Sequence, residues 1–160
     1  MKIQIEYANS KESWQIVVCP VSYMHRSHYY ALVRDGTEWF IKRSGGVAIE
    51  EEQDVEGAAL RNLVYFRAEM LCSLGKDDIE RVDNGYIYLA RYKSGEGEYE
   101  RKPLPAEWLT LDGMAEKMPP SLMDSWLAAS RQLNAGVLAS IPSSFLAEGG
   151  ATTTSSIIDT

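Results

Sequence analysis

The sequence predicts an α+β protein in which antiparallel β-hairpins pack on a mainly helical domain, with a flexible C-terminal tail. Residues 2–8 alternate apolar and polar side chains, which is the period of a half-buried strand. From about Glu56 to Leu74, apolar residues recur at three- and four-residue spacing, as in an amphipathic helix. A chain of 160 residues can bury one sizeable core. We therefore expect one domain over residues 1–148 and a flexible tail over residues 149–160.

Turn residues between alternating segments indicate two hairpins. In the first, residues 9–12 join the opening strand to an apolar, β-branched run that stops at Pro20, which has no N–H for a sheet ladder. In the second, residues 86–91 alternate, and the turn 94–97 leads into residues 98–104. The tyrosines of this second hairpin suit a pleated surface packed on a helix.

Capping residues predict the helix boundaries in the first half of the chain. Ser22 is suited to cap a helix that ends at Gly36. Residues 37–43 fit either a short strand or a continuation of that helix. Asp54 can cap the amphipathic helix of the centre, and Gly75 can end it.

Helices return in the last third of the chain. Thr110 is suited to cap a short helix, which Pro119 and Pro120 interrupt. Pro120 also fits the first position of the next helix, which Asn134 and Gly136 are suited to end. The residues after it have no helical period and little to bury, so the tail should be mobile.

Charge and hydropathy argue against two kinds of partner. The formal net charge of -7 works against nucleic-acid binding, because binding phosphates relies on Lys and Arg. No apolar run of about 18 residues is present, and the amino terminus lacks the continuous apolar core of a signal peptide. We expect a cytoplasmic protein with no membrane association. Cys19 and Cys72 fit reduced core thiols, although counting alone leaves a single bridge open.

No pattern in the sequence specifies a catalytic site or a metal centre. Cys19, His25 and His28 are soft ligands in one neighbourhood, but a clear fourth ligand and a paired-cysteine signature are missing. The acidic run 50–54 lacks the spaced ligands and the turn glycine of a calcium loop. The turn 94–97 lacks the Lys-Ser/Thr continuation of a phosphate loop. We therefore predict a protein that is not an enzyme and holds neither cofactor nor metal.

The apolar side chains of the last third are the candidate partner-binding residues. The predicted helix that starts at Pro120 carries an apolar stripe and no obvious chemistry. Such a stripe can bind a partner helix, with tryptophan as a typical anchor. It is equally what a helix needs to close its own core, and both interpretations stay open here. The predicted contact residues are Trp108, Leu109, Leu122, Trp126 and Leu133.

Three segments together resemble the tail assembly chaperones of long-tailed (siphovirus-like) bacteriophages. They are "VVCPVSYMHRSHYYALV", "AALRNLVYFRAEMLCSL" and "LPAEWLTLDGMAEKMPPSLMDSWLAASRQLNAGVLA". In that family, a strand hairpin runs through a proline into a helix, a middle helix follows, and apolar positions recur near the end. The matching positions are Trp108, Leu109, Gly113, Pro119, Leu122, Trp126, Leu133 and Asn134. The resemblance spans residues 1 to about 138.

The resemblance implies a non-enzymatic assembly factor that binds the helical tape measure protein and tail tube subunits in the host cytoplasm. An acidic cover with apolar grooves suits such a partner, because an isolated tape measure helix exposes apolar stripes. Self-association stays open. The tyrosine-rich segment 86–99 and the uncharged Thr/Ser tail differ from the family. Two alternatives therefore remain: a phage head-tail connector or tail-completion protein, and a small inhibitor that blocks a host defence enzyme.

Overall fold

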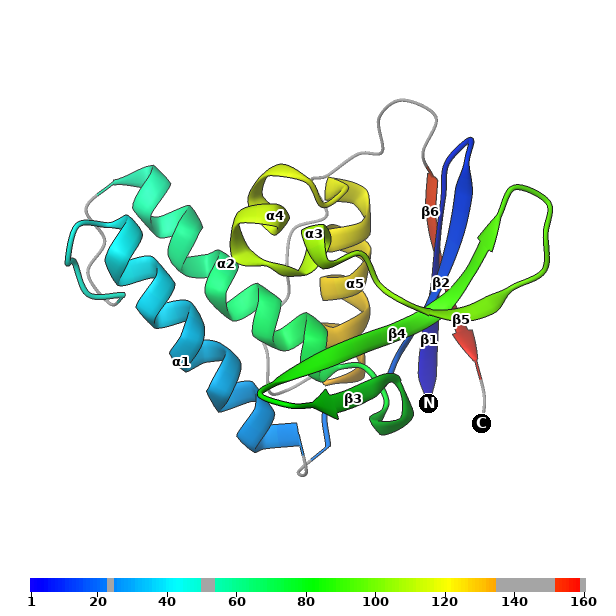
Figure 1. Cartoon of the computed structure of the whole chain (residues 1–160), viewed down its shortest axis with the longest axis horizontal. Helices are drawn as coiled ribbons and strands as arrows, with labels where there is room; N and C mark the ends of the chain where they lie inside the picture. Colours follow the sequence, from blue (N-terminus) through cyan, green and yellow to red (C-terminus); the bar gives the residue numbers. More distant parts are fainter. Residues whose placement is uncertain (23–24, 50–53, 135–151, 159–160) are drawn as a thin grey trace.

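The computed structural model describes residues 1–22, 25–49, 54–134 and 152–158. Figure 1 shows a helical part beside a twisted sheet, so the predicted α+β class is confirmed. The strands are β1 (Lys2–Ala8), β2 (Glu12–Val18), β3 (Ile79–Val82), β4 (Gly85–Ser94), β5 (Glu100–Pro103) and β6 (Thr152–Ile158). The helices are α1 (Arg26–Arg43), α2 (Val55–Cys72), the 3-10 helix η2 (Lys76–Asp78), α3 (Ala106–Leu109), α4 (Leu111–Glu116) and α5 (Pro120–Leu133).

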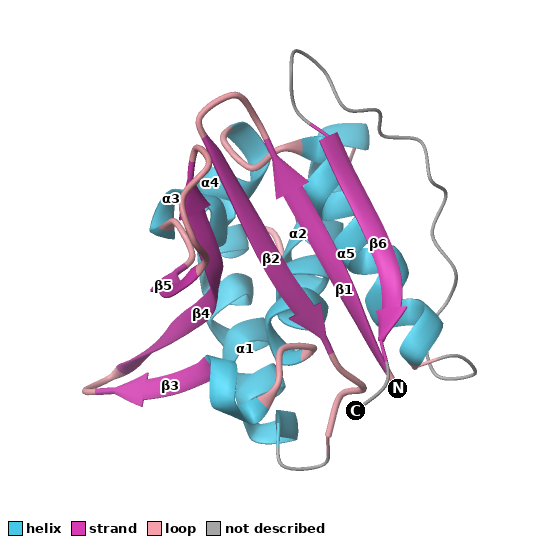
Figure 2. Ribbon diagram, turned by 90° about the vertical axis from the view of Figure 1, so that its right-hand side faces the viewer, coloured by secondary structure: helices cyan, strands magenta, loops and turns pink. Residues whose placement is uncertain are grey.

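The strands form one antiparallel sheet in the order β3-β4-β2-β1-β6, with β5 paired to β4. The helices lie behind the strands β2, β1 and β6 in Figure 2. Alternation along β1 therefore sends Ile3, Ile5 and Tyr7 into the core and leaves the intervening side chains on the other face. One face of the sheet builds the core.

The first predicted hairpin is confirmed, with Ile5 opposite Ile16 and Tyr7 opposite Trp14. Its turn is closed by the side chain of Asn9, which accepts hydrogen bonds from the backbone N–H groups of the residues two and three positions later. Strands β4 and β5 confirm the second hairpin. Strand β3, which pairs with the first half of β4, was not predicted from the sequence.

The prediction of a flexible tail is wrong for residues 152–158, which form strand β6. This strand pairs with the whole of β1, from Lys2 opposite Ile158 to Ala8 opposite Thr152. Side-chain hydroxyls also join it to the helical layer, because the Oγ of Ser121 lies 2.9 Å from the Oγ1 of Thr153. The ladder gives this segment the backbone partners that it lacks in isolation. The remainder of the predicted tail lies outside the described residues.

Gly36 does not end helix α1, contrary to the sequence prediction. The helix begins at Arg26, with His25 rather than Ser22 at its N-cap, and continues to Arg43. A Cβ atom at Gly36 would lie 2.4 Å from the Cγ1 atom of Val64 in α2. The glycine therefore permits a close approach of α1 and α2, which lie side by side in Figure 1. This contact outweighs the weak helix propensity of glycine.

Helix α2 follows the prediction at its amino end. The side chain of Asp54 accepts a hydrogen bond of 2.6 Å from the backbone N–H of Gly57, as an N-cap does. The helix stops at Cys72, just before the predicted end at Gly75. Its buried Glu69 binds Arg131 of α5, with Nε and Oε2 3.1 Å apart. This ion pair joins two helices that are far apart in the sequence.

Ser73 connects the two helices to the sheet. Its hydroxyl donates to the carbonyl of Met70 over 2.7 Å and accepts from the indole N–H of Trp126 over 3.0 Å. Its own carbonyl accepts from the backbone N–H of Cys19, and Leu74 forms a single bridge to Val18. The residue is fully buried, so these hydrogen bonds satisfy polar groups that have no access to water.

Helices α4 and α5 begin as predicted, whereas the short helix α3 was not predicted. Thr110 caps α4 by accepting from the N–H of Gly113, and Pro120 occupies the first turn of α5. A Cβ at Gly113 would lie 1.7 Å from the carbonyl oxygen of Glu107, so only glycine fits this corner. Asn134 is the C-cap of α5, whereas the predicted stop at Gly136 lies outside the described residues.

We predict that the effect of Gly36→Ala on stability depends on Val64. In the native protein the substitution should lower the free energy of unfolding by about 1–3 kcal/mol, because the new methyl group overpacks the interface between α1 and α2. In a Val64→Ala background it should instead raise the free energy, by up to about 1 kcal/mol, since alanine favours helix. Urea unfolding of the four proteins of this double-mutant cycle measures the coupling. Stabilisation by Gly36→Ala in the native background would contradict the close contact.

Candidate binding site

The five predicted partner-binding residues are part of the core, which corrects their predicted role as a surface stripe. Trp126 and Leu122 have no exposed area, Trp108 is 6% exposed and Leu109 is 9% exposed. Leu133 is partly buried and packs against the same core. An apolar stripe on a helix covers either its own core or a partner, and here it covers the core. Trp108, Leu109, Leu122 and Trp126 therefore offer almost no accessible surface to a partner, and Leu133 offers only part of its side chain.

The two tryptophans also have fixed partners inside the protein. The ring of Trp108 packs edge-on against Tyr7, with 5.6 Å between ring centres, and against Trp14, with 5.9 Å. Trp126 donates its indole N–H to Ser73. Replacing either side chain would therefore disturb the fold before it changed any binding surface.

A polar cavity of about 350 Å³ lies between α1, α2 and the hairpin of β3 and β4. It brings together basic, aromatic and imidazole side chains from segments that are distant in the sequence. Its wall consists of His28, Ala31, Leu32, Arg34, Asp35, Arg67, Arg81, Asn84, Gly85, Tyr86 and Tyr88. A cavity with convergent polar groups and perturbed titratable residues is the best physical indicator of a binding site.

His28 is the most enclosed polar residue of this wall, with 4% of its surface exposed. The core-facing register of α1 places it one turn before Leu32. Its Nε2 lies 2.7 Å from the hydroxyl of Tyr88, and the ring of Tyr86 packs on the imidazole with 3.9 Å between ring centres. Its Nδ1 is buried and has no hydrogen-bond partner among the residues that the structure describes. An imidazole thus stands inside the protein with one nitrogen unsatisfied.

The surroundings of the cavity keep His28 and Tyr88 neutral. Burial, followed by the positive charges of His25 and Arg67, lowers the pKa of His28 from 6.5 to about 4. Burial also raises the pKa of Tyr88 well above its usual value, although Arg67 opposes that shift. At neutral pH the pair is therefore an uncharged hydrogen bond.

The arginines make the cavity electropositive in a protein that is acidic as a whole. Arg67 is partly buried, and its Nε donates to the carbonyl of Leu109 over 2.5 Å. Within the described parts of the chain, no carboxylate lies within 4.0 Å of the guanidinium of Arg67 or of Arg81. Arg34 faces Asp35 at 3.8 Å, in a pair that is largely exposed. The wall thus has three arginines and one aspartate.

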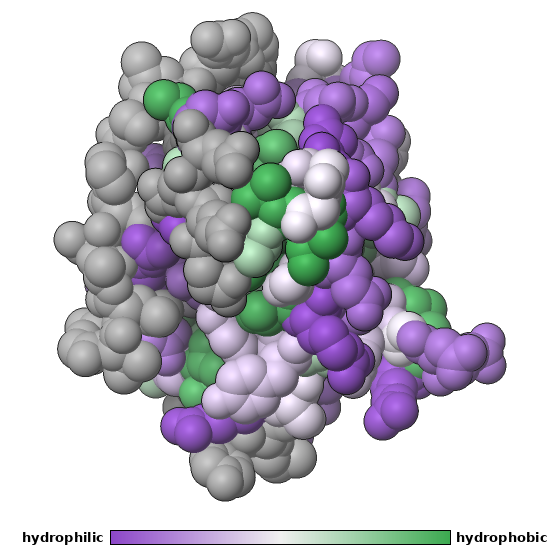
Figure 3. Space-filling model, turned by 90° about the vertical axis from the view of Figure 1, so that its left-hand side faces the viewer, coloured by the Kyte–Doolittle hydropathy of each residue, from purple (hydrophilic) through white to green (hydrophobic). Residues whose placement is uncertain are grey.

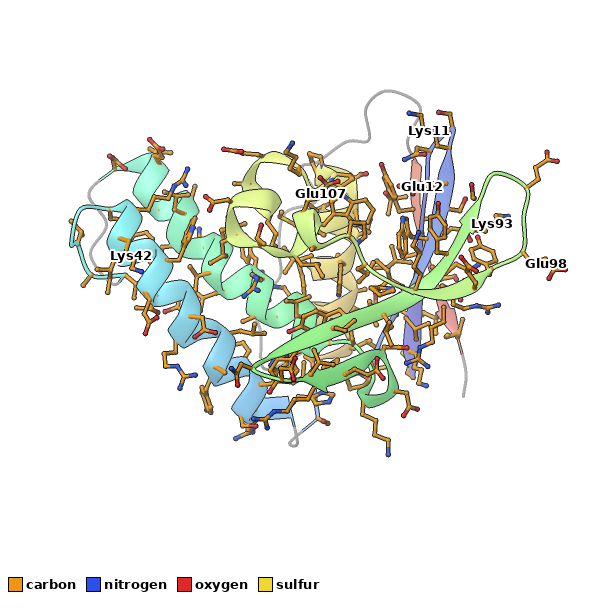
Figure 4. The ribbon with its side chains drawn as sticks, viewed as in Figure 1. Lys11, Glu12, Lys42, Lys93, Glu98 and Glu107 are labelled. Carbon is orange, nitrogen blue, oxygen red and sulfur yellow. The ribbon has the colours of Figure 1, made fainter. Side chains whose placement is uncertain are left out.

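Other surfaces offer less chemistry. Lys11 and Glu12 lie at the turn between β1 and β2, and Glu98 points outward from the hairpin of β4 and β5 (Figure 4). Lys93 of the same hairpin packs its ammonium group over the ring of Tyr99, 4.8 Å from the ring centre. The face on the side of α1 and α2 shows apolar surface bordered by polar side chains (Figure 3). Single exposed apolar residues are normal on a protein surface.

Cys19, His25 and His28 were the one set of neighbouring soft ligands in the sequence, and their pattern did not predict a metal site. The structure separates their roles, since His28 pairs with Tyr88 and Cys19 is half-buried beside Gly75. Across residues 1–22, 25–49, 54–134 and 152–158, no three His, Cys, Asp or Glu side chains are placed to hold a metal ion. Cys72 is free and buried, and burial raises its pKa to about 12.

Comparisons with known proteins found no match. No family model, no curated protein and no solved structure is similar to this chain. In the described part of the chain, none of the helices has the length and hydropathy needed to span a membrane.

We predict that His28 makes the protein less stable at acidic pH. Its folded-state pKa lies below the unfolded value, so its contribution to stability is complete above about pH 6.5 and falls as the pH drops towards 4. The free energy of unfolding of the native protein should fall as the pH is lowered from 7 to 4.5. For His28→Gln, which can still hydrogen bond to Tyr88, this fall should be smaller by about 2–3 kcal/mol. Urea unfolding at both pH values measures this difference. His25→Gln is the matched control, and its free energy of unfolding should fall between the two pH values nearly as much as that of the native protein. Equal losses for the native protein and His28→Gln would contradict the account.

Proposed function

We propose that this protein is a non-enzymatic binding protein that holds a protein partner at the mouth of the cavity beside His28. The observation that carries the proposal is the buried, half-satisfied imidazole of His28 in a cavity lined by three arginines. Buried polar atoms are almost always satisfied, so an unsatisfied one in a cavity is a reason to expect a ligand. Unpaired buried charge is similarly unfavourable.

The rim of the cavity supports a protein as the partner. Tyr86 is 36% exposed although it lines the cavity, and Val82, at the end of the same hairpin, is 39% exposed. Tyrosine and arginine are enriched among the residues that dominate protein interfaces. An arrangement of apolar side chains around a polar cavity suits a partner that presents a polar anchor flanked by apolar residues.

The chemistry of the cavity supports binding rather than catalysis. The Nε2 of His28 is already occupied by Tyr88, so it is not free to take a proton from a substrate. The cavity wall contains no serine, cysteine, threonine or lysine to serve as a nucleophile beside that imidazole.

The resemblance to tail assembly chaperones suggests which partner this would be. In that case the protein binds the tape measure protein or tail tube subunits of a long-tailed phage during tail assembly. The contact surface moves from the buried tryptophan stripe to the mouth of the cavity, because Trp108 and Trp126 are needed inside. Trp108 and Trp126 lie between the sheet and the helices, so we assign them to the stability of the fold rather than to partner binding.

We predict that the full chain co-elutes with a co-expressed tape measure fragment in size exclusion. The double variant Arg81→Glu and Tyr86→Ser should lose this co-elution, because it reverses a charge of the cavity wall and removes its aromatic rim. Both side chains are exposed, so the fold should survive, and circular dichroism checks it. Arg91→Glu is the control for the charge reversal, since Arg91 is exposed on β4, the strand of Tyr86, and does not line the cavity.

Two results would contradict the proposal. Absence of co-elution for the native protein would remove the tape measure partner. Equal co-elution of the double variant and of Arg91→Glu would remove the cavity mouth as the contact surface.

A further inference from the structure

We infer that the cavity beside His28 is a carboxylate-binding site that takes an acidic side chain, Asp or Glu. The inference rests on the proposed function only in naming a protein as the source of that side chain. The carboxylate would enter between α1 and the hairpin of β3 and β4, where the guanidinium groups of Arg67 and Arg81 line the same space.

Arg67 is the first reason for an anionic ligand. Its position on α2 places it at the inner side of the cavity, and one of its N–H groups is used by the carbonyl of Leu109. The other N–H groups have no hydrogen bond to a described residue, and no carboxylate lies within ion-pair distance in the described parts. A guanidinium presents paired donors that match the two oxygens of a carboxylate. Arg67 is only partly buried, and Asp35 acts on its charge from beyond ion-pair distance, so the remaining donors of Arg67 are available to a ligand.

His28 is the second reason, and it is independent of the first. When the hydroxyl of Tyr88 donates to Nε2, the proton of the neutral imidazole is on Nδ1, which then needs an acceptor. The ring of Tyr86 covers the imidazole, and that ring is itself one third exposed. His28 and Arg67 line the same cavity, so a carboxylate held there is the acceptor that Nδ1 lacks. The ligand would thus meet both the free donors of Arg67 and the unpaired nitrogen of His28.

The wall of the cavity attracts anions, and its apolar part favours a carboxylate on a side chain over a free phosphate. Three arginines and one aspartate leave an excess of two positive charges, and one of these arginines already faces Asp35. Net charge alone does not distinguish a carboxylate from a phosphate, because an excess of two positive charges attracts both. The aromatic wall of Tyr86 and the apolar side chain of Leu32 suit the methylene groups that carry the carboxylate.

Binding of small probes to the full chain tests the site without any partner protein. The first probe is N-acetyl-glutamic acid α-amide, which carries a single side-chain carboxylate. The second is N-acetyl-glutamine α-amide, which has the same shape and no charge. The third is inorganic phosphate. Two-dimensional NMR titrations at pH 7 follow the signals of Gly85, the Nε of Arg67 and the ring of His28.

The expected result is saturable shifts of these signals with the glutamic acid probe and at least tenfold weaker binding of the glutamine probe. Arg81→Gln should weaken binding of the glutamic acid probe by about twofold to fivefold, because Arg81 is exposed and an exposed ion pair contributes modestly. Arg91→Gln, outside the cavity, should leave it unchanged.

Three results would overturn the inference: equal binding of the glutamic acid and glutamine probes, tighter binding of phosphate than of the glutamic acid probe, and equal effects of Arg81→Gln and Arg91→Gln. The outcome is separable from that of the proposed function. If the probe binds but the tape measure fragment does not co-elute, the carboxylate site is supported and the tape measure partner is contradicted. If the fragment co-elutes but the probe does not bind, the tape measure partner is supported and the carboxylate site is contradicted.

Discussion

The need to satisfy buried polar groups around Ser73 holds the helical layer and the sheet in one arrangement. A serine at the end of α2 supplies a donor, a hydroxyl acceptor and a carbonyl acceptor, and each is used by a different part of the chain. Because hydrogen bonds are directional, this junction orients α2 with respect to the sheet more strictly than apolar contact alone would. Arg67 lies less than two turns before Ser73 on the same helix. The place of its guanidinium near Tyr88 therefore depends on this junction.

A second constraint positions the other wall of the cavity. The contact between Gly36 and Val64 brings α1 close to α2, and His28 lies two turns before Gly36 on the buried face of α1. Two packing contacts, one at the middle of α2 and one at its carboxyl end, thus bring an imidazole and a guanidinium to one cavity. Neither contact is part of the cavity wall, so the positions of the wall residues depend on close packing elsewhere in the core.

Much of the fold could be predicted from the sequence because its signals are local. The alternation of β1, the cap at Asp54 and the cap at Thr110 each depend on residues within a few positions, and the structure confirms them. The course of α1 beyond Gly36 depends on Val64, and no local pattern reports that contact. The pairing of β6 with β1 joins segments about as far apart as the chain allows, so the tail looked unstructured by itself.

The candidate site was harder to predict than the fold. The stripe of Leu122 and Trp126 was found correctly as a stripe, but spacing alone cannot say whether a helix covers its own core or a partner. The cavity had no sequence motif, because Arg67, Tyr88 and His28 come from three elements and meet only through tertiary packing. The nearest signal was the occurrence of His28 in the helix predicted to begin after Ser22.

Strand β6 has a consequence for how the protein is made. β1 leaves the ribosome before β6, and some 140 residues separate the two strands, so the sheet stays open along this side of β1 while the residues between them are made. Closure of this ladder joins segments of high sequence separation, which makes it a late and slow step of maturation. Until then, the nascent chain offers an unfinished edge to any neighbouring strand.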